Sequence, residues 1–384
     1  MVRKYKLYGW MLQLMMLLWC IQNRRRSFLL RCALLFPRRR RQMMTLLFRT
    51  APLRNLVGAL SCEARPQLRS ADYPRMTQQR FDSLSEAEMW DNFRFYRADF
   101  SRLQALFKFP DVIHIPRHGH FTGLEAMCVL LRRLRYPSTL SLLVPFFGRR
   151  EQQLSALFHF ALIFIDNKYR HLLENLALWS NRAPAYQQSI VNKGSPYANI
   201  IGFLDATINR CCKPIRNQRE YYTGWKKKHG LKWQALHFPD GMTGHLFGPV
   251  PTRQNDPRVL QLSGILQQWA LHLPAYVMYA DKGYPWTQYI QIGWPQYYVP
   301  TAAMMAFNRV MAAFRIVVEW GFHDVSSLWP FVDFVPQQKV LLQPLGRTYR
   351  VAVILKNCHV CIHGGTTAQY YSCDPPGLEE YLGW

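Results

Sequence analysis

Two aspartates in this chain each end a short apolar run, and this arrangement strongly constrains the fold. The runs cover residues 199–205 and 276–281, are rich in β-branched and aromatic side chains, and are flanked by turn residues. Such runs are typical of buried strands in a parallel sheet. Because ligands collect at the carboxyl ends of parallel strands, we expect Asp205 and Asp281 to face a common site.

A third acid, Glu319, lies inside an apolar run at residues 315–322 that we predict to be helical and buried. A buried carboxylate is costly unless a cation or a hydrogen-bond partner compensates it. Three acids on adjacent rigid elements supply the hard oxygen ligands that Mg²⁺ or Mn²⁺ prefers. A single aspartate at a strand end is more simply a turn or a cap, so the metal hypothesis depends on all three acids.

Asp256 precedes Pro257, and this pair predicts a helix start with Asp256 as the N-cap. The alternative is that Asp256 is a fourth acid at the edge of the metal site. The spacing alone favours the cap.

The net charge is strongly positive and unevenly distributed. The 384 residues contain 48 Lys and Arg but only 23 Asp and Glu, a formal net charge of +25. Residues 1–80 account for +15 of it, with 17 basic and two acidic residues. A polyanionic partner is indicated, and nucleic acid fits better than a membrane surface. Nine scattered cysteines suggest no disulfide framework and favour a reducing compartment.

Residues 1–82 are predicted to form a basic, poorly ordered leader. Its apolar stretch at 8–21 is shorter than the roughly 20 residues that cross a bilayer and lacks a small-residue cleavage site. We therefore expect no secretion and no membrane partner. The run Arg38–Arg41 suits a nuclear-import signal or a phosphate-binding arm, although a solvated tail explains it equally well.

Residues 83–195 are predicted to be helical and to resemble a DNA-binding region. Capping boxes are expected at Ser83 with Glu86 and at Thr122 with Glu125. Short helices joined by basic turns are typical of a helix-turn-helix module, and also of any small helical bundle. Arg132 and Arg133, in the second helix, are candidate nucleic-acid contacts.

Residues 196–365 alternate strand-like and helical runs, which predicts an α/β domain with a mixed sheet; residues 366–384 are expected to be a polar tail. Between the first two strands lies a basic segment that also contains Tyr221, Tyr222 and Trp225. Its cations suit phosphate neutralisation, and its aromatic rings suit base stacking. The alternative is an exposed hairpin with a soluble, charged face that does not contact a substrate. The candidate DNA-binding residues of this segment are Lys213, Arg216, Arg219, Lys226, Lys227 and Lys228.

Cysteine and histidine residues cluster near the C-terminus. Cys358, His359, Cys361 and His363, with Cys373 downstream, have donor atoms suited to zinc. One Cys-x-x-Cys pair is a weak signal, so a packed helix end is the preferred interpretation.

In order along the chain, these motifs resemble a known family. Residues 202–384 are similar to the DDE superfamily endonuclease domain of PIF/Harbinger-type transposases and of the nuclease derived from them. Residues 121–148 resemble the helical region before that domain. The matching motifs are Gly202-Phe203-Leu204-Asp205-Ala206-Thr207, Arg216-Asn217-Gln218-Arg219, Tyr222-Thr223-Gly224-Trp225-Lys226, Gly248-Pro249, Asn255-Asp256, Asp281-Lys282-Gly283-Tyr284-Pro285, Val318-Glu319-Trp320-Gly321-Phe322 and Pro375-Pro376-Gly377-Leu378-Glu379-Glu380-Tyr381.

The resemblance implies an RNase H-like fold with metal-binding carboxylates at Asp205, Asp256, Asp281 and Glu319. It makes Asp256 a ligand as well as a cap. Two positions depart from the family pattern: Ala206 replaces a glycine, and Asn255 replaces a histidine that offers a proton shuttle or a phosphate donor.

We therefore expect a metal-dependent DNA endonuclease or transposase-like protein in the nucleus, with the cytoplasm as a second location. Asp205 would bridge two Mg²⁺ or Mn²⁺ ions about 3.5–4 Å apart, flanked by Asp281 and Glu319, to hydrolyse a phosphodiester. The family suggests a Myb-like DNA-binding partner, and a homo-oligomer is an option. The alternatives are a domesticated, catalytically inactive DNA-binding or scaffold protein, and an RNase H-type ribonuclease.

Overall fold

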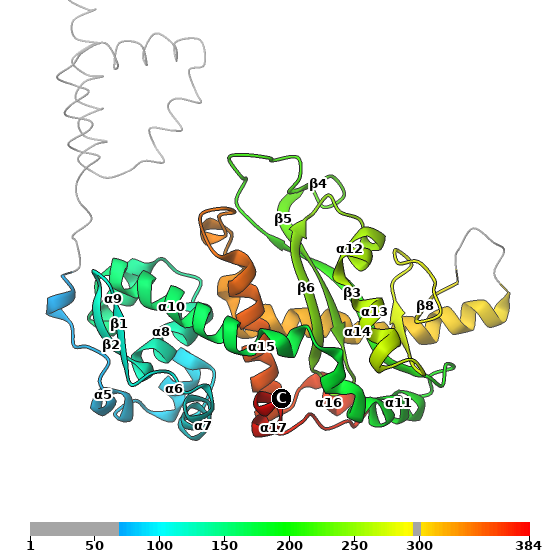
Figure 1. Cartoon of the computed structure of the whole chain (residues 1–384), viewed down its shortest axis with the longest axis horizontal. Coiled ribbons are helices and arrows are strands. Elements are labelled where there is room, and N and C mark those ends of the chain that lie inside the picture. Colours follow the sequence, from blue (N-terminus) through cyan, green and yellow to red (C-terminus); the bar gives the residue numbers. More distant parts are fainter. Residues whose placement is uncertain (1–68, 295–300) are drawn as a thin grey trace, which may run out of the picture. The chain divides into compact units, whose positions relative to one another are not determined.

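The computed structural model describes residues 69–294 and 301–384 (Figure 1). The predicted apolar stretch at 8–21 and the Arg38–Arg41 cluster lie outside these residues. None of the described helices is long and apolar enough to span a bilayer.

The first part of the described chain is mainly helical, as predicted, with α8 at its centre (Figure 1). All 13 residues of α8 except Arg132 and Arg135 are buried. The elements are η1 (Ser70–Asp72), α5 (Gln78–Asp82), α6 (Glu86–Phe93), α7 (Arg97–Phe107), β1 (Val112–Ile115), β2 (Gly119–Thr122), α8 (Gly123–Arg135), η2 (Leu140–Leu143), α9 (Val144–Phe147), α10 (Glu151–Tyr169), η3 (Arg170–Leu173), η4 (Leu176–Arg182) and α11 (Ala183–Asn192).

Three details of this region differ from the prediction. Residues 69–82 are not part of a separate leader, because Met76 and Phe81 are buried in the core. The first capping box is Ser85 with Glu88, two residues later than expected. A small antiparallel hairpin, β1–β2, interrupts the predicted all-helical region.

The predicted N-cap at Thr122 is confirmed, since its side chain accepts a hydrogen bond from the Glu125 backbone N–H. The Glu125 carboxylate does not complete a capping box. It forms a buried bidentate pair with Arg149, with N–O distances of 2.7 and 2.8 Å.

The second part contains a six-stranded mixed sheet with flanking helices (Figure 1). Strand β5 is antiparallel to both β3 and β6, whereas β7 is parallel to β3 and β8 to β7. The resulting order β6-β5-β3-β7-β8, with β4 paired to the start of β5, confirms the expected RNase H-like fold. The strands are β3 (Ile200–Arg210), β4 (Tyr222–Thr223), β5 (Lys228–His237), β6 (Thr243–Pro251), β7 (Val277–Ala280) and β8 (Ile290–Ile292).

The helices of this part pack on the sheet and on the first part of the chain. Arg347 and Arg350 of α15 both bind the buried Asp166 of α10. The residues after 365 are not a free tail, since Leu378 and Tyr381 are buried. The elements are α12 (Asp256–Ser263), α13 (Ile265–His272), α14 (Ala302–Leu328), η5 (Pro330–Asp333), η6 (Val335–Gln337), α15 (Leu345–His363), α16 (Thr366–Tyr371) and α17 (Leu378–Gly383).

Helix α14 crosses the sheet at very close range. A Cβ atom on Gly321 would lie 2.4 Å from Nδ1 of His237 on β5, so only glycine fits there. This contact fixes the height of α14, which also carries Arg315 and Glu319, above the sheet.

Candidate active site

Asp205 lies at the point where strand β3 leaves the core. Residues 200–204 are buried and pair with β7, and from Phe203 onward the strand also pairs with β5. Beyond Leu204, which aligns with Ala280, the pairing with β7 stops and the strand becomes half-buried. The carboxylate therefore lies at a step in the sheet, at the carboxyl end of the neighbouring strand.

Asp281 follows β7 directly, as predicted, whereas Asp205 does not end its strand, because β3 continues to Arg210. The two aspartates are neighbours because β3 and β7 pair up to Leu204 and Ala280, the residues just before them. Both approach one cation, Arg315 of α14. Its Nη1 donates to Oδ1 of Asp281 at 2.6 Å, and its Nη2 lies 3.5 Å from Oδ2 of Asp205. Residues from two strands and one helix thus meet around a single positive charge.

The environment of Asp205 disfavours its charged form. Burial raises the pKa of Asp205 to about 6. A hydrogen bond from the Ala206 backbone N–H and the positive charge of Arg315 lower this pKa, but they do not cancel the effect of burial. The negative charges of Asp281 and Asp256 push the pKa in the same direction as burial. This carboxylate would therefore gain from a stronger cation nearby.

Asp256 is not the predicted N-cap of α12. Asn255 takes that position and accepts a hydrogen bond from the Arg258 backbone N–H. Asp256 is the first helical residue, and its Oδ1 accepts a hydrogen bond from Nζ of Lys232 on β5 at 3.0 Å. With Asn255 as the cap, the Asp256 carboxylate can face the other acids.

Tyr284 is a site residue that was not predicted, although it lies in the motif Asp281-Lys282-Gly283-Tyr284-Pro285. Its side chain is 2% exposed, and its hydroxyl has no hydrogen-bond partner among the described residues. Burial raises its pKa well above the ordinary value, and the charges of Asp256, Asp205 and Asp281 add to that rise. The charges of the three aspartates thus all act on one buried phenol.

Glu319 differs from the prediction, because it is exposed rather than buried. The apolar residues Val317 and Val318 face the sheet, and Glu319 turns outward. It lies one helical turn after Arg315, on the same side of α14. Among residues 69–294 and 301–384, no ion pair to Glu319 is present.

A divalent metal fits this donor set in part. Asp205 and Asp281 already share one cation, and hard carboxylate oxygens are the ligands that Mg²⁺ and Mn²⁺ prefer. In the described part of the chain, however, no three Asp, Glu, His or Cys side chains are grouped closely enough to hold a metal ion. No such group is present at residues 358–363 of the described chain either. Cys358 is buried and His359 is half-buried on helix α15.

The predicted DNA-binding cations divide into two groups. Lys213, Arg216, Arg219, Lys226 and Lys227 are exposed and Lys228 is half-buried. Arg133 is buried, with its guanidinium 4.2 Å from the centroid of the Phe331 ring, so the prediction that it contacts DNA is wrong. Arg132 covers the Phe146 ring at 3.6 Å, and burial lowers its pKa to about 10. Because α8 is buried along most of its length, it is not an exposed recognition helix.

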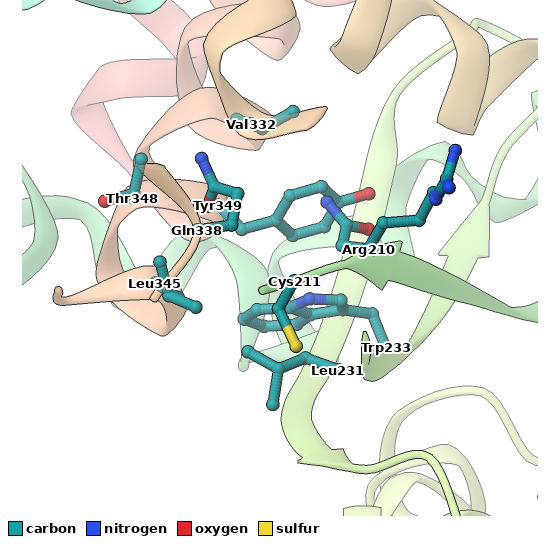
Figure 2. A pocket seen from close by; sticks show the side chains of 10 residues that line it. Arg210, Cys211, Leu231, Trp233, Val332, Gln338, Leu345, Thr348 and Tyr349 are labelled. Carbon is teal, nitrogen blue, oxygen red and sulfur yellow. The ribbon is translucent and has the colours of Figure 1, made fainter. Parts of the chain in front are cut away.

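A narrow pocket lies near the end of β3, away from the acids (Figure 2). Trp233 and Tyr349 line it with ring centroids 4.7 Å apart. Burial raises the pKa of Cys211, another lining residue, to about 11, so its thiol stays protonated and is a poor nucleophile. The chemistry of the site therefore depends on the acids rather than on this pocket.

The comparison with protein families agrees with this geometry. Searches of curated proteins and of solved structures gave no match to the chain. Residues 204–357 match the family model described as DDE superfamily endonuclease, and this stretch contains all four predicted acids, so this part of the chain is similar to DDE superfamily endonucleases.

Proposed function

We propose that this protein is a metal-dependent DNA endonuclease, or a transposase-like protein, of the PIF/Harbinger type. The observation that carries the proposal is the convergence of Asp205 and Asp281, from two parallel strands, on one cation within the segment similar to DDE superfamily endonucleases. Two-metal hydrolysis of a phosphodiester uses such carboxylates to hold the metal ions against the substrate.

In this proposal Asp205, Asp281 and Glu319 hold Mg²⁺ or Mn²⁺, with Asp256 at the edge of the site. When bound, two such ions would stabilise the charge on the scissile phosphate and activate the attacking water. The chain itself supplies orientation: Lys232 holds Asp256, and the 2.6 Å hydrogen bond from Arg315 holds Asp281. The charge of Arg315 also opposes the effect of burial on Asp205, so it favours the ionised form of that carboxylate.

The exposed cations of residues 213–228 are proposed to neutralise DNA phosphates, with strong salt dependence. A nuclear location, a Myb-like DNA-binding partner and self-association are further parts of the proposal. They follow from the basic composition and from the family resemblance.

A second function is DNA binding without cleavage, by a domesticated protein. The observation that favours it is that Arg315, rather than a third acid, completes the group around Asp205 and Asp281. The two functions share the DNA-binding surface and differ only in the use of the acids.

Plasmid nicking with Mg²⁺ or Mn²⁺ separates the two functions. We expect wild type to nick DNA and Asp205→Asn to lose at least about 100-fold in rate, because a carboxylate ligand is lost. Asp111→Asn, which changes an exposed aspartate in the helical region, is the matched control and should retain full activity. Absence of nicking by wild type would favour the binding protein, and cleavage of only the RNA strand of a hybrid would favour a ribonuclease.

A thermal unfolding series tests metal binding without relying on activity. Mn²⁺ should raise the melting temperature of wild type, because a ligand that binds only the native state stabilises it. The rise should disappear in Asp205→Asn and persist in Asp111→Asn. An equal rise in all three proteins would contradict the assignment of Asp205 as a ligand.

A further inference from the structure

The structure distinguishes the three aromatic residues of the basic segment. Tyr221 is half-buried, and its carbonyl accepts a hydrogen bond from the Gly230 backbone N–H. Tyr222 is 43% exposed and lies 5.1 Å from the His229 ring. Trp225 is 90% exposed and makes none of the aromatic or cation–π contacts found in the described residues. Its indole ring therefore has both faces available to a partner.

A short hairpin holds Trp225 at its tip. Strand β4 pairs with the start of β5 through Tyr222 with His229 and Thr223 with Lys228, which leaves only residues 224–227 in the turn (Figure 1). The turn is closed by Lys227 in the left-handed region, at φ 48°. A four-residue turn on a paired base keeps the tryptophan exposed, although burying such a large apolar ring would stabilise the fold.

The positive charge around the tip of the β4–β5 hairpin favours binding of a polyanion. Residues 211–228 contain six cations, and no carboxylate among the described residues lies within salt-bridge distance of any of them. The one acid of the segment, Glu220, is instead 3.7 Å from Arg253. A free aromatic ring among unpaired cations matches a nucleic acid with an accessible base, because the cations bind phosphates and the ring stacks.

The register of the sheet relates the tip to the acids. Asp205 aligns with Ala235 of β5, and Lys228, where the tip begins, is seven residues back along the same strand. At about 3.3 Å per residue this is about 23 Å. For DNA lying along β5, that distance corresponds to about seven base pairs, at 3.4 Å each.

We propose that the β4–β5 hairpin recognises DNA that is locally unpaired, with Trp225 stacking on an unstacked base about seven base pairs from the scissile phosphate. The proposal uses the DNA substrate of the proposed function, but it concerns binding and does not require cleavage. It adds a structural preference to a surface whose cations alone would bind any duplex.

Binding of the full-length Asp205→Asn protein in EDTA tests the proposal, since cleavage is then excluded. The probes are a fluorescent 30-base-pair duplex and the same duplex with a three-base mismatch bubble. We expect about tenfold tighter binding to the bubble, because one base stacked on an aromatic ring contributes about that factor. Adding Trp225→Ala should abolish the preference, whereas Trp225→Phe should retain most of it.

Two controls keep the result specific. Trp286→Ala removes another exposed tryptophan, 69% exposed, and should leave the preference intact. Trp225→Ala should leave the melting temperature and the salt dependence of binding unchanged, because it removes neither buried surface nor charge.

Equal binding of duplex and bubble by the Asp205→Asn protein would overturn the proposal, as would a preference that survives Trp225→Ala. Loss of binding to anionic phosphatidylserine vesicles in Trp225→Ala, without loss of bubble preference, would assign the tip to a membrane surface instead. Bubble preference in a protein that never nicks DNA would support this inference while the nuclease function fails.

Discussion

Two arginines of the helical region and the lysines of the β4–β5 hairpin are all basic but have opposite surroundings. Arg133 and Arg149 are buried against aromatic rings, and Arg149 is paired with Glu125. Lys226 and Lys227 are exposed and have no carboxylate partner in the described part of the chain. A cation already satisfied inside the protein stabilises the fold, whereas an unpaired surface cation remains available for phosphates. Substitutions in the two groups should therefore have different effects, on stability in the first and on DNA binding in the second.

Arg149→Ala should destabilise the protein by about 3–5 kcal/mol, because it leaves the buried Glu125 carboxylate without its partner. Urea unfolding measures the loss. Arg75→Ala, which removes an exposed arginine of the same region, is the control and should change stability by less than about 0.5 kcal/mol. Similar small losses in both variants would show that the buried pair is not structural.

Lys356→Met should remove a pH dependence of stability. Burial lowers the pKa of Lys356 to about 8, although Asp324 and Asp240 oppose the shift. Between pH 8 and pH 10.5 the unfolded chain binds more protons at this residue, so the stability of wild type should rise with pH there, by on the order of 3 kcal/mol. Urea unfolding across this range measures the rise.

That rise should be absent in Lys356→Met and present in Lys339→Met, which changes an exposed lysine. Identical pH profiles for all three proteins would mean that Lys356 titrates normally in the native state.

Replacing Lys226, Lys227 and Lys228 by glutamine should weaken DNA binding about tenfold or more at 0.1 M salt. The slope of log affinity against log salt should fall by about 2–3, because up to three phosphate contacts are lost. Fluorescence anisotropy across a salt series measures both quantities. Glutamine at Arg75, Lys108 and Arg117, three exposed cations of the helical region, should have a smaller effect. Equal losses would mean that DNA binding is not localised to the hairpin.

Arg216→Gln should have the smallest effect on DNA binding among these variants. One phosphate contact should reduce the salt slope by about 1, and stability should stay within about 0.5 kcal/mol of wild type. An unchanged slope together with an unchanged melting temperature would remove Arg216 from the binding surface.

The strands that form the site could be predicted because the information is local. An apolar run with β-branched residues is long enough to identify a buried strand, and parallel strands end at the same edge of the sheet. Asp205 and Asp281 therefore approach the same arginine, although β3 does not end at Asp205 as predicted, because it continues to pair with β5 as far as Arg210. The α/β class followed from the same runs, whereas the RNase H-like arrangement was implied by the family resemblance.

The orientation of helical side chains could not be predicted in the same way. Whether Glu319 or Arg133 faces inward depends on where the sheet and Phe331 lie, and these are far away in the sequence. Arg315 could have been found, since it lies four residues before Glu319 and four-residue spacing places both on one side of a helix. Caps were predicted to within two residues, because several adjacent polar residues compete for the position.

The absence of space above Gly321 has a genetic consequence. An added methyl group there would meet the His237 ring at 2.4 Å and force α14 away from the sheet, displacing Arg315 and Glu319 together. Alanine at this position should therefore impair the site, although all four acids remain in the sequence. Sequence surveys that score only the acids would count such an allele as intact.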